Sequence, residues 1–420
     1  MCIINRLKPN AMITAVTLGL LAGSGYVPFS QPILAFAEFG SEVFMRLLKM
    51  VSLPIIFLSI TTTISGLTHY DELKDTGSKV LHYTLATTIC AASIALLLFL
   101  VIDPANAGLL QLSLDTEVIP ESQMSYINYL INVIPSNMIL AFAENNVIGT
   151  LLIAVGIGVA SLTLPLHQKD TLHRLFSSLY SAIFKLTGWI LKLVPFAIWA
   201  FIALFVNSLV TQALPLNLLS LYLICVIAAN IIQAVVILPI LLMSKGLNPI
   251  SIFQQMLPAL QIAFWSKSSS AALPVALQHI KKDKEVDPKI ANISMPLCIS
   301  INMNGCAAFI LITVFFVAKC HGIVFSLPEM IVWVFIATLT AVGNAGVPMG
   351  CYFLSCALLG SMGIPLKIMG FILPFYAMID MLESAINVWS DICVTLVVNA
   401  DSEASADKLE TPADAVQPQQ

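Results

Sequence analysis

The chain alternates long apolar runs with short polar links, a pattern typical of proteins that cross a membrane several times. No Asp, Glu, Lys or Arg occurs from residue 193 to 244 or from 330 to 366. Each of these runs exceeds the roughly 20 apolar residues that cross a bilayer as a helix. Apolar runs in the first part of the chain predict spanning helices at about residues 11–29, 40–66, 80–102, 146–164, 177–206 and 214–243.

The segment at about 250–280 does not fit a single spanning helix. Lys245 and Lys281 flank it, so both of its ends belong on the same side of the membrane. Its middle, Ser266–Pro274, is rich in small polar residues and contains a helix-breaking proline. Backbone of this kind is tolerated at membrane depth only where it is packed in protein or lines a cavity. We therefore predict a re-entrant hairpin here.

A second interruption, Gly343–Pro348, divides an apolar segment that runs from about 327 to 366. Two interrupted segments in corresponding positions of two halves are the best sequence indication of a transporter binding site. Two kinked ordinary helices are the alternative interpretation of these segments.

Basic residues occupy alternate links, and this orients the chain in the membrane. Lys and Arg are absent from the links at 24–39 and 207–213 and from the polar stretch at 103–126. They are present in the links between these, at Lys74, Lys79, Lys169, Arg174 and Lys245. By the positive-inside rule, these links and both termini lie in the cytoplasm. We expect a multi-pass protein of the cell (inner) membrane with its first helix retained.

Composition excludes several other classes of protein. Of the 420 residues, 58% are hydrophobic and only 10% are charged, whereas soluble domains have about 25% charged residues. A soluble enzyme, a secreted disulfide scaffold and a nucleic-acid-binding protein are therefore excluded. The acidic stretch 401–420 carries the whole net charge of −4 and is expected to be a disordered cytoplasmic tail. The nine cysteines show no paired metal-ligand spacing, so no metal site is expected from them.

One face of the last predicted helix is polar. At about 100° per residue, five polar residues share this face: Asp380, Glu383, Ser384, Asn387 and Asp391. An ionised carboxylate at bilayer depth costs a few kcal/mol, so these acids need cations, protons or a polar ligand. The alternative is pairing with internal lysines, of which the nearest in sequence are Lys185, Lys192, Lys267, Lys319 and Lys367.

A matching break interrupts the preceding apolar run at Ser300–Cys306, where two Asn and a Gly weaken the helix. Carbonyl groups freed there, together with the carboxylates, suit a hard cation such as Na⁺. Half-helix N-termini in the hairpins supply positive dipole ends for a substrate carboxylate. No phosphate-binding loop of the G-x-x-x-x-G-K-[ST] type occurs, which disfavours transport driven by ATP hydrolysis. The residues alone indicate a cation-coupled secondary transporter of a carboxylate substrate.

Three motifs follow one another along the second half of the chain: Ser268-Ser269-Ser270 with Pro274, Asn302-Met303-Asn304-Gly305, and Asn387 with Asp391. In this order they closely resemble the dicarboxylate/amino acid:cation symporter family, which is the glutamate-transporter-like family. The resemblance extends to about residue 400. It implies an all-α polytopic membrane protein with about eight transmembrane helices, two re-entrant hairpins and inverted repeats. It also implies a homotrimer that works as an elevator-type transporter.

The resemblance further implies two domains. Residues 1–79 would hold scaffold helices 1 and 2, and residues 104–213 would hold scaffold helices 4 and 5 with an extracellular link. Residues 80–103 would form helix 3 of the transport domain. The rest of that domain, 214–400, would comprise helix 6, hairpin 1 at about 250–280, helix 7, hairpin 2 at about 327–366 and helix 8.

For the substrate, the family pattern implies that Ser269 and the backbone of the first hairpin hold the carboxylate. Asp380 would hold the amino group, and Val347 and Pro348 would close over the bound molecule. The full set implied to bind substrate is Ser268, Ser269, Ser270, Cys306, Val347, Pro348, Asp380, Glu383, Ser384 and Asn387.

For sodium, the resemblance implies two ions, one at Asp391 and the other beside the Met303 sulfur. The full set of implied ligands is Cys298, Ser300, Asn302, Met303, Ala341, Val342, Asn344, Asn387 and Asp391. A third site is implied at Tyr83, Thr87, Asn302 and Asn304. Members with that site carry Asp where this chain has Asn304 and Thr where it has Ala86, so only two coupled ions are expected.

Glu383 stands where family members that take acidic substrates carry an Arg. That Arg forms two parallel hydrogen bonds to the side-chain carboxylate of the substrate. Cys306 stands where those members have Thr, and Lys267 replaces the usual hairpin Arg. The order Asp-x-x-Glu-Ser-x-x-Asn-x-x-x-Asp is similar to that of the bacterial sodium/serine-threonine symporter branch. We therefore expect sodium-coupled uptake of a small neutral L-amino acid such as serine or threonine, with Glu383 accepting the hydroxyl hydrogen bond or carrying a proton.

Several alternatives stay open. The main one is sodium- or proton-coupled symport of glutamate, aspartate or a dicarboxylate. Glu383 is also a suitable counter-ion for a cationic amino acid, and the two hairpins could line a channel. A membrane enzyme is not expected, because no Ser-His-Asp arrangement or H-E-x-x-H motif is visible. The expected partners are the substrate, the lipid bilayer and further copies of the chain, without nucleic acid.

Overall fold

Helices make up all of the regular structure in the described part of the chain. The computed structural model describes residues 9–24, 30–66, 70–105, 135–143, 147–210, 216–283, 286–344 and 349–410. Its first half contains α1 (Pro9–Gly23), α2 (Ser30–Ser65), α3 (Tyr70–Ile102), α5 (Met138–Ala143), α6 (Val147–Leu162), α7 (Leu166–Leu191) and α8 (Val194–Val210). Its second half contains α9 (Leu216–Ile232), the π-helix η3 (Gln233–Ile237), α10 (Leu238–Met243), α11 (Pro249–Ser266), α12 (Ser269–Asp283), α13 (Pro288–Ile301), α14 (Asn304–Cys320), α15 (Leu327–Val342), α16 (Gly350–Ser361) and α17 (Lys367–Glu410).

Several of these helices are long and apolar enough to cross a bilayer. Among the described residues, four helices pass this test by length and composition, and the bent pair α7–α8 makes a fifth. Shorter apolar helices or helical stretches lie in α1, α2, α6, α15 and α16. The prediction of an all-α polytopic membrane protein is therefore confirmed, whereas the two re-entrant hairpins stay a prediction.

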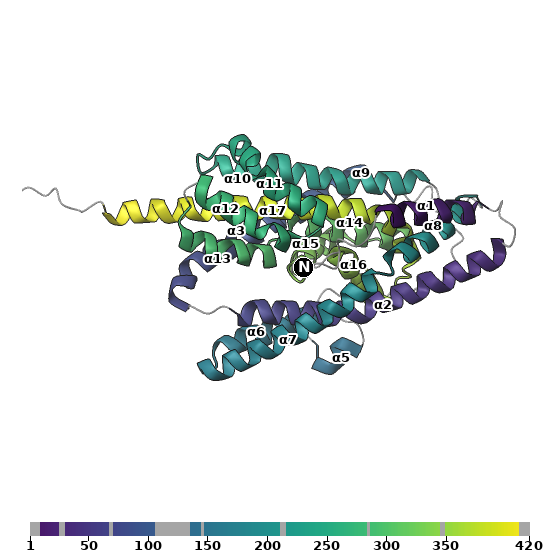
Figure 1. The fold of residues 1–420 in the computed structure, drawn as a ribbon, viewed down its shortest axis with the longest axis horizontal. Helices are drawn as coiled ribbons and strands as arrows, with labels where there is room; N and C mark the ends of the chain where they lie inside the picture. Colours follow the sequence, from purple (N-terminus) through teal and green to yellow (C-terminus); the bar gives the residue numbers. More distant parts are fainter. Residues whose placement is uncertain are drawn as a thin grey trace, which may run out of the picture.

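The first group of helices packs around α2. α1 lies against α8, and α2 contacts α6, α7 and α8. The rings of Phe36 on α2 and of Phe196 and Trp199 on α8 contact one another. In Figure 1, α2, α6 and α7 form the lower layer of the molecule.

The second group packs around α14 and α17. α14 contacts α3, α9, α15, α16 and α17, and every residue from Asn304 to Ala318 is buried. A helix that is apolar on all sides is typical of one enclosed by other helices. α17 runs along the middle of the molecule (Figure 1). Asp380, Glu383, Asn387 and Asp391 on its polar face are all buried, so this face points into protein.

Polar caps followed by proline explain where three helices of the second group begin. The Asn248 side chain accepts hydrogen bonds from the backbone of Ile250 and Ser251, at 3.1 and 3.3 Å. Asp287 caps α13, and Ser326 belongs to a capping box at the start of α15. Each of these helices has proline in its first two positions, where the missing N–H removes no helical hydrogen bond.

Two predicted spans differ in detail from the structure. The apolar run at 177–206 corresponds to α7 and α8, which meet at a 49° bend after Leu191. α7 begins earlier, at Leu166, because its first turns are amphipathic and so lie outside the apolar run. The run at 214–243 is α9, η3 and α10 in succession. In η3, the Ala234 carbonyl accepts a hydrogen bond from the Trp389 indole of α17 at 3.1 Å.

The acidic end of the chain is ordered further than expected. α17 continues to Glu410, so the expected disordered tail does not hold for residues 401–410, and residues 411–420 lie outside the described part. Asp401 pairs with Lys245 at 2.5 Å and accepts a hydrogen bond from the Tyr83 hydroxyl at 2.5 Å. The hydrogen bond to Asp401 raises the pKa of Lys245 above its ordinary value. These contacts tie α17 to α3 and to the end of α10.

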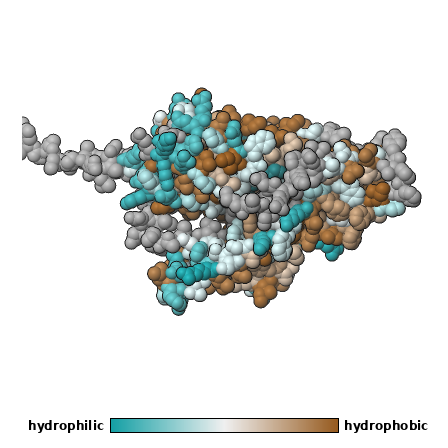
Figure 2. Space-filling view, in the orientation of Figure 1, coloured by the Kyte–Doolittle hydropathy of each residue, from teal (hydrophilic) through white to brown (hydrophobic). Residues whose placement is uncertain are grey.

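The surface divides into a hydrophilic end and hydrophobic flanks. Hydrophilic residues gather at the end from which α17 extends, and hydrophobic residues are prominent along the sides (Figure 2). α3, α9 and α15 expose Leu97, Ile224 and Leu339. Exposed apolar side chains of this size on helix flanks fit contact with lipid tails.

A buried hydrogen bond between α9 and α14 offers a test of this packing. Tyr222→Phe removes the bond between the Tyr222 and Thr313 hydroxyls, which is 2.8 Å long, and keeps the ring stacked on Phe316. Hydrogen bonds between membrane helices contribute about 0.6 kcal/mol on average. We expect the free energy of unfolding to fall by about 0.5–1.5 kcal/mol, measured by thermal unfolding in detergent. The matched control is Tyr180→Phe on α7, and equal losses in the two variants would contradict the account.

Candidate functional site

One small pocket collects most of the polar residues singled out in the sequence. It lies where the gap between α11 and α12, the start of α14, the end of α15 and the middle of α17 meet. Its lining residues are Lys267, Ser269, Met303, Cys306, Asn344, Asp380, Glu383, Ser384 and Asn387. All of them except Lys267 belong to the predicted substrate or sodium sets.

Two helices begin at this pocket. α11 ends at Ser266 and is followed by Lys267, whose backbone is left-handed with φ of 55°. α12 begins at Ser269, which is buried. α14 begins at Asn304. The free N–H groups of a helix N-terminus attract negative charge. The first turns of α12 and α14 therefore favour an anionic group between them.

The carboxylates of Asp380 and Glu383 are buried and only partly satisfied. The exposed fractions of the two residues are 5% and 1%. The Tyr376 hydroxyl donates to Glu383 Oε2 at 3.1 Å. Glu383 Oε1 and Asp380 Oδ2 have no hydrogen-bond partner among the described residues. Buried polar atoms without a partner cost free energy, so both oxygens are suited to accept hydrogen bonds from a ligand.

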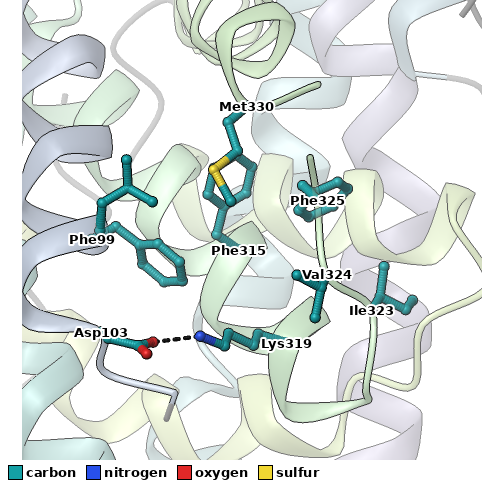
Figure 3. A pocket seen from close by; sticks show the side chains of 9 residues that line it. Phe99, Asp103, Phe315, Lys319, Ile323, Val324, Phe325 and Met330 are labelled. Carbon is teal, nitrogen blue, oxygen red and sulfur yellow. Dashed lines mark hydrogen bonds and ion pairs between the residues drawn. The ribbon is translucent and has the colours of Figure 1, made fainter. Parts of the chain in front are cut away.

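Most of the candidate internal lysines lie away from the carboxylates of Asp380 and Glu383. Lys319 pairs with Asp103 at 2.5 Å, at the end of α3, beside a separate pocket lined by aromatic and aliphatic side chains (Figure 3). Of the five candidate lysines, only Lys267 lines the pocket of Asp380 and Glu383. The polar face of α17 is therefore not a simple ion-paired strip.

A backbone break separates α13 from α14. Asn302 and Met303 have non-helical torsion angles, with ψ of 79° and 62°. The break releases backbone carbonyls from the helical ladder in a buried region next to α17. The Cys298 carbonyl remains bonded, since it accepts from the Asn302 amide at 2.7 Å.

Asp391 lies directly beside this break. Its Oδ1 accepts a hydrogen bond from the Asn302 side-chain amide at 3.1 Å, while its Oδ2 has no partner among the described residues. The side chain is fully buried. An acid in this setting needs a cation or a proton to offset its burial.

A polar layer connects α3, α14 and α17 around Asn302. Thr87 donates to Asn302 Oδ1 at 3.3 Å, and Thr88 donates to Asn304 Oδ1 at 2.8 Å. The amides of Asn302 and Asn304 both donate to the Ser390 hydroxyl, at 2.8 and 2.6 Å. Of the residues implied for a third sodium site, this layer contains Thr87, Asn302 and Asn304. The Tyr83 hydroxyl instead bonds Asp401, outside the layer.

Asn387 and Asn344 bring the sulfur atoms of the site together. Asn387 accepts from the Gly305 amide at 2.9 Å, and its own amide lies 3.4 Å from both the Met303 and Cys306 sulfurs. The Asn344 amide lies 3.1 Å from the Cys306 sulfur and 3.4 Å from that of Cys351. Cys306 and Cys351 are joined as a disulfide.

Two glycines allow this close packing. A Cβ on Gly305 would lie 2.8 Å from Asn230 Oδ1 and 3.0 Å from the Glu383 backbone. A Cβ on Gly350 would collide with the Asn344 side chain. A larger residue would force the Asn230 side chain to shift at Gly305 and the Asn344 side chain to move at Gly350.

The remaining predicted residues do not line the pocket. Ser270 is exposed and Ser268 is half-buried. Val347 and Pro348 lie outside the described residues. The predicted sodium ligands outside the pocket are Cys298, Ser300, Asn302, Ala341, Val342 and Asp391; among these, Asn302 and Asp391 contact each other.

Sequence reasoning missed several polar neighbours of the site. Ser390 follows Asn387 by three residues, so helical spacing could have included it. Thr88 follows Thr87 directly, and Tyr376 precedes Asp380 by one helical turn. Cys351 has no such signal, because 45 residues separate it from Cys306.

The sequence matches one family of membrane transporters and several of its members. A family model for the sodium:dicarboxylate symporter family matches residues 10–401. The proton/glutamate-aspartate symporter of Escherichia coli is 26% identical, over 92% of this chain and 91% of that protein. Human neutral amino acid transporter A is 25% identical, over 92% of this chain and 81% of its own. The proton/sodium-glutamate symport protein of Bacillus caldotenax is 25% identical, over 91% and 93% respectively.

The family model covers nearly the whole chain, and the buried polar pocket lies within the matched residues. The protein therefore belongs to the sodium:dicarboxylate symporter family and is a multi-pass membrane transporter, not an enzyme.

Proposed function

We propose that the protein takes up a small neutral L-amino acid, serine or threonine first, by symport with sodium. The observation that carries this proposal is the unpartnered, buried Oε1 of Glu383 in the pocket. A carboxylate here repels an acidic side chain and accepts a hydrogen bond from a hydroxyl. Relatives named for acidic and for neutral amino acids both match the chain, so the proposal for the substrate rests on the pocket residues.

The proposal implies one orientation for the substrate in this pocket. Its carboxylate lies at Ser269 and the first turn of α12, where helix N–H groups favour negative charge. Its amino group lies at Asp380, whose Oδ2 lacks a partner. Its hydroxyl then donates to Glu383, which Tyr376 holds in place from the other side.

Sodium acts as the co-transported ion at two places. Asp391 Oδ2 and carbonyls released by the break at Asn302 and Met303 form one oxygen-rich site. Carbonyls at the end of α15 and the Met303 sulfur hold the second ion. Asn304 supplies no negative charge to the layer at Thr87, which disfavours a third ion.

The same proposal includes the division into two domains. α1, α2, α6, α7 and α8 form the scaffold, and α3 with α9 to α17 forms the transport domain. The grouping of helix contacts supports this division, because α2 and α14 each have most of their partners within one group. α11–α12 and α15–α16 act as the two hairpins. Both termini lie in the cytoplasm, and the protein is a homotrimer in the cell membrane.

Lys267 supports the main alternative, which is an acidic amino acid or dicarboxylate as substrate. It lines the same pocket as Glu383, and a lysine can bind a side-chain carboxylate as a point charge. Competition between substrates separates the two proposals.

Sodium coupling is tested with Asp391→Asn, which keeps the shape of the side chain and removes its charge. We expect sodium-driven uptake of labelled serine into proteoliposomes to fall at least about 100-fold, since the loss of an ionic ligand costs several kcal/mol. The matched control is Asp401→Asn on the same helix, which should keep sodium-driven uptake. Retained sodium dependence in the Asp391 variant would refute the assignment of this ion.

Selectivity is tested with Glu383→Gln. A lost hydrogen bond to a charged group costs about 1.5–3 kcal/mol, so the affinity for serine should fall roughly 10- to 150-fold. The affinity for alanine, which lacks the hydroxyl, should change much less. The measurement is competition against labelled substrate in proteoliposomes, with Glu329→Gln on α15, a half-buried acid outside the pocket, as control. Aspartate competing as well as serine in the unmodified protein would favour the acidic alternative.

A further inference from the structure

The most unusual group of side chains in the protein is a sulfur cluster at the edge of the pocket. Cys306, at the start of α14, and Cys351, at the start of α16, have Cα atoms 5.4 Å apart and are each 1% exposed. A carboxylate oxygen of Glu383 and the two sulfurs lie within 4.8 Å of one another. Among the described residues, no other set of His, Cys, Asp and Glu side chains meets in this way.

Two further observations indicate that this cluster is suited to a ligand. Glu383 Oε1 is buried and has no hydrogen-bond partner among the described residues. The Met303 sulfur also lies nearby, because the Asn387 amide is 3.4 Å from both it and the Cys306 sulfur. Once the disulfide is reduced, the cluster presents two thiol sulfurs, a thioether sulfur and a carboxylate. The proposed transport function uses neither Cys351 nor its pairing with Cys306.

These donors match the preferences of thiophilic divalent ions. Zinc is bound by thiolate at about 2.3 Å and by carboxylate oxygen at about 2.0–2.2 Å in tetrahedral sites. The two sulfurs and a Glu383 carboxylate oxygen, all within 4.8 Å of one another, are close enough to share one such ion. A pair of thiolates favours these ions over Na⁺, Mg²⁺ and Ca²⁺, which prefer sites made mainly of oxygen ligands. The cluster is therefore chemically distinct from the oxygen-rich region at Asp391.

We propose that Cys306, Cys351 and Glu383 in the reduced protein form a binding site for one thiophilic divalent cation, Zn²⁺ or its analogue Cd²⁺. The site exists only after the disulfide is opened. A dithiol reductant supplies two electrons and two protons, the S–S bond breaks into two thiols, and the reductant becomes a disulfide. The cation then displaces the two thiol protons to solvent and bonds both thiolates and the carboxylate.

The bound ion occupies part of the substrate pocket, because Cys306 and Glu383 both line it. It also links α14, α16 and α17 through one atom. The ion and the disulfide are mutually exclusive, since both use the same two sulfurs. Oxidised protein therefore does not bind the ion at this site.

Cadmium binding is measured directly on the full chain, purified in detergent, reduced with dithiothreitol and freed of the reductant. The readout is the ultraviolet thiolate-to-cadmium charge-transfer band, which needs no transport. We expect a saturable band at one ion per chain. Cys351→Ser should lower the affinity at least about 100-fold, because direct ligands matter more than the neighbours whose loss costs 10- to 100-fold.

Cys356→Ser on the same helix is the matched control and should leave the band unchanged. Glu383→Gln also removes a direct ligand, so it should weaken binding at least about 100-fold and leave the thiolate band in place at saturation. An unchanged affinity in Cys351→Ser would overturn the proposal, as would the absence of a band in reduced protein with both thiols titratable. Should Cys351→Ser fail to fold, unmodified protein reoxidised with diamide provides the second comparison. Equal cadmium affinity before and after reoxidation would also overturn it.

This test is independent of the proposed transport function. A protein that binds cadmium but does not take up serine would refute the substrate proposal alone. A protein that takes up serine but binds no cadmium would refute the cation site alone.

Discussion

Burial of the carboxylates on α17 is the constraint on which the rest of the structure depends. Asp380, Glu383 and Asp391 are at most 5% exposed, and each has one oxygen without a partner among the described residues. Charge at this depth is unfavourable unless a cation, a proton or a polar ligand offsets it. The proposed coupling follows from the same requirement. In the proposed function, a cation at Asp391 and an amino acid at Asp380 and Glu383 would each lower the cost of the charge near the other, so each would favour the binding of the other.

The interrupted helices place backbone groups that can bind a ligand beside these carboxylates. An uninterrupted helix bonds its interior backbone groups internally, so those groups would not be available to a ligand. The break at Asn302 and Met303 and the turn at Lys267 instead place carbonyls and helix N-termini around α17. Gly305 then lets α14 approach the Glu383 backbone closely. Irregular backbone is tolerated there because protein, not lipid, surrounds it.

Much of the fold and most of the pocket could be predicted from the sequence. The apolar runs located the helices, and the 100° spacing placed Asp380, Glu383 and Asn387 on one face, where the pocket residues now meet. Local patterns could not predict the bend after Leu191 or the early start of α7, since an amphipathic turn is not an apolar run. Nor could they pair Cys306 with Cys351, because that contact depends on how α14 and α16 pack in three dimensions. The continuation of α17 through Asp401 was missed for the same reason, as Lys245 and Tyr83 are distant in sequence.

The central claim is that sodium and a small neutral amino acid together satisfy the buried carboxylates. The most direct test is the thermal stability of the purified, unmodified protein with serine present, measured once in sodium chloride and once in choline chloride at equal ionic strength. The account predicts that serine raises the unfolding midpoint in sodium and has little effect in choline. An equal rise in both salts, or none in sodium, would contradict it.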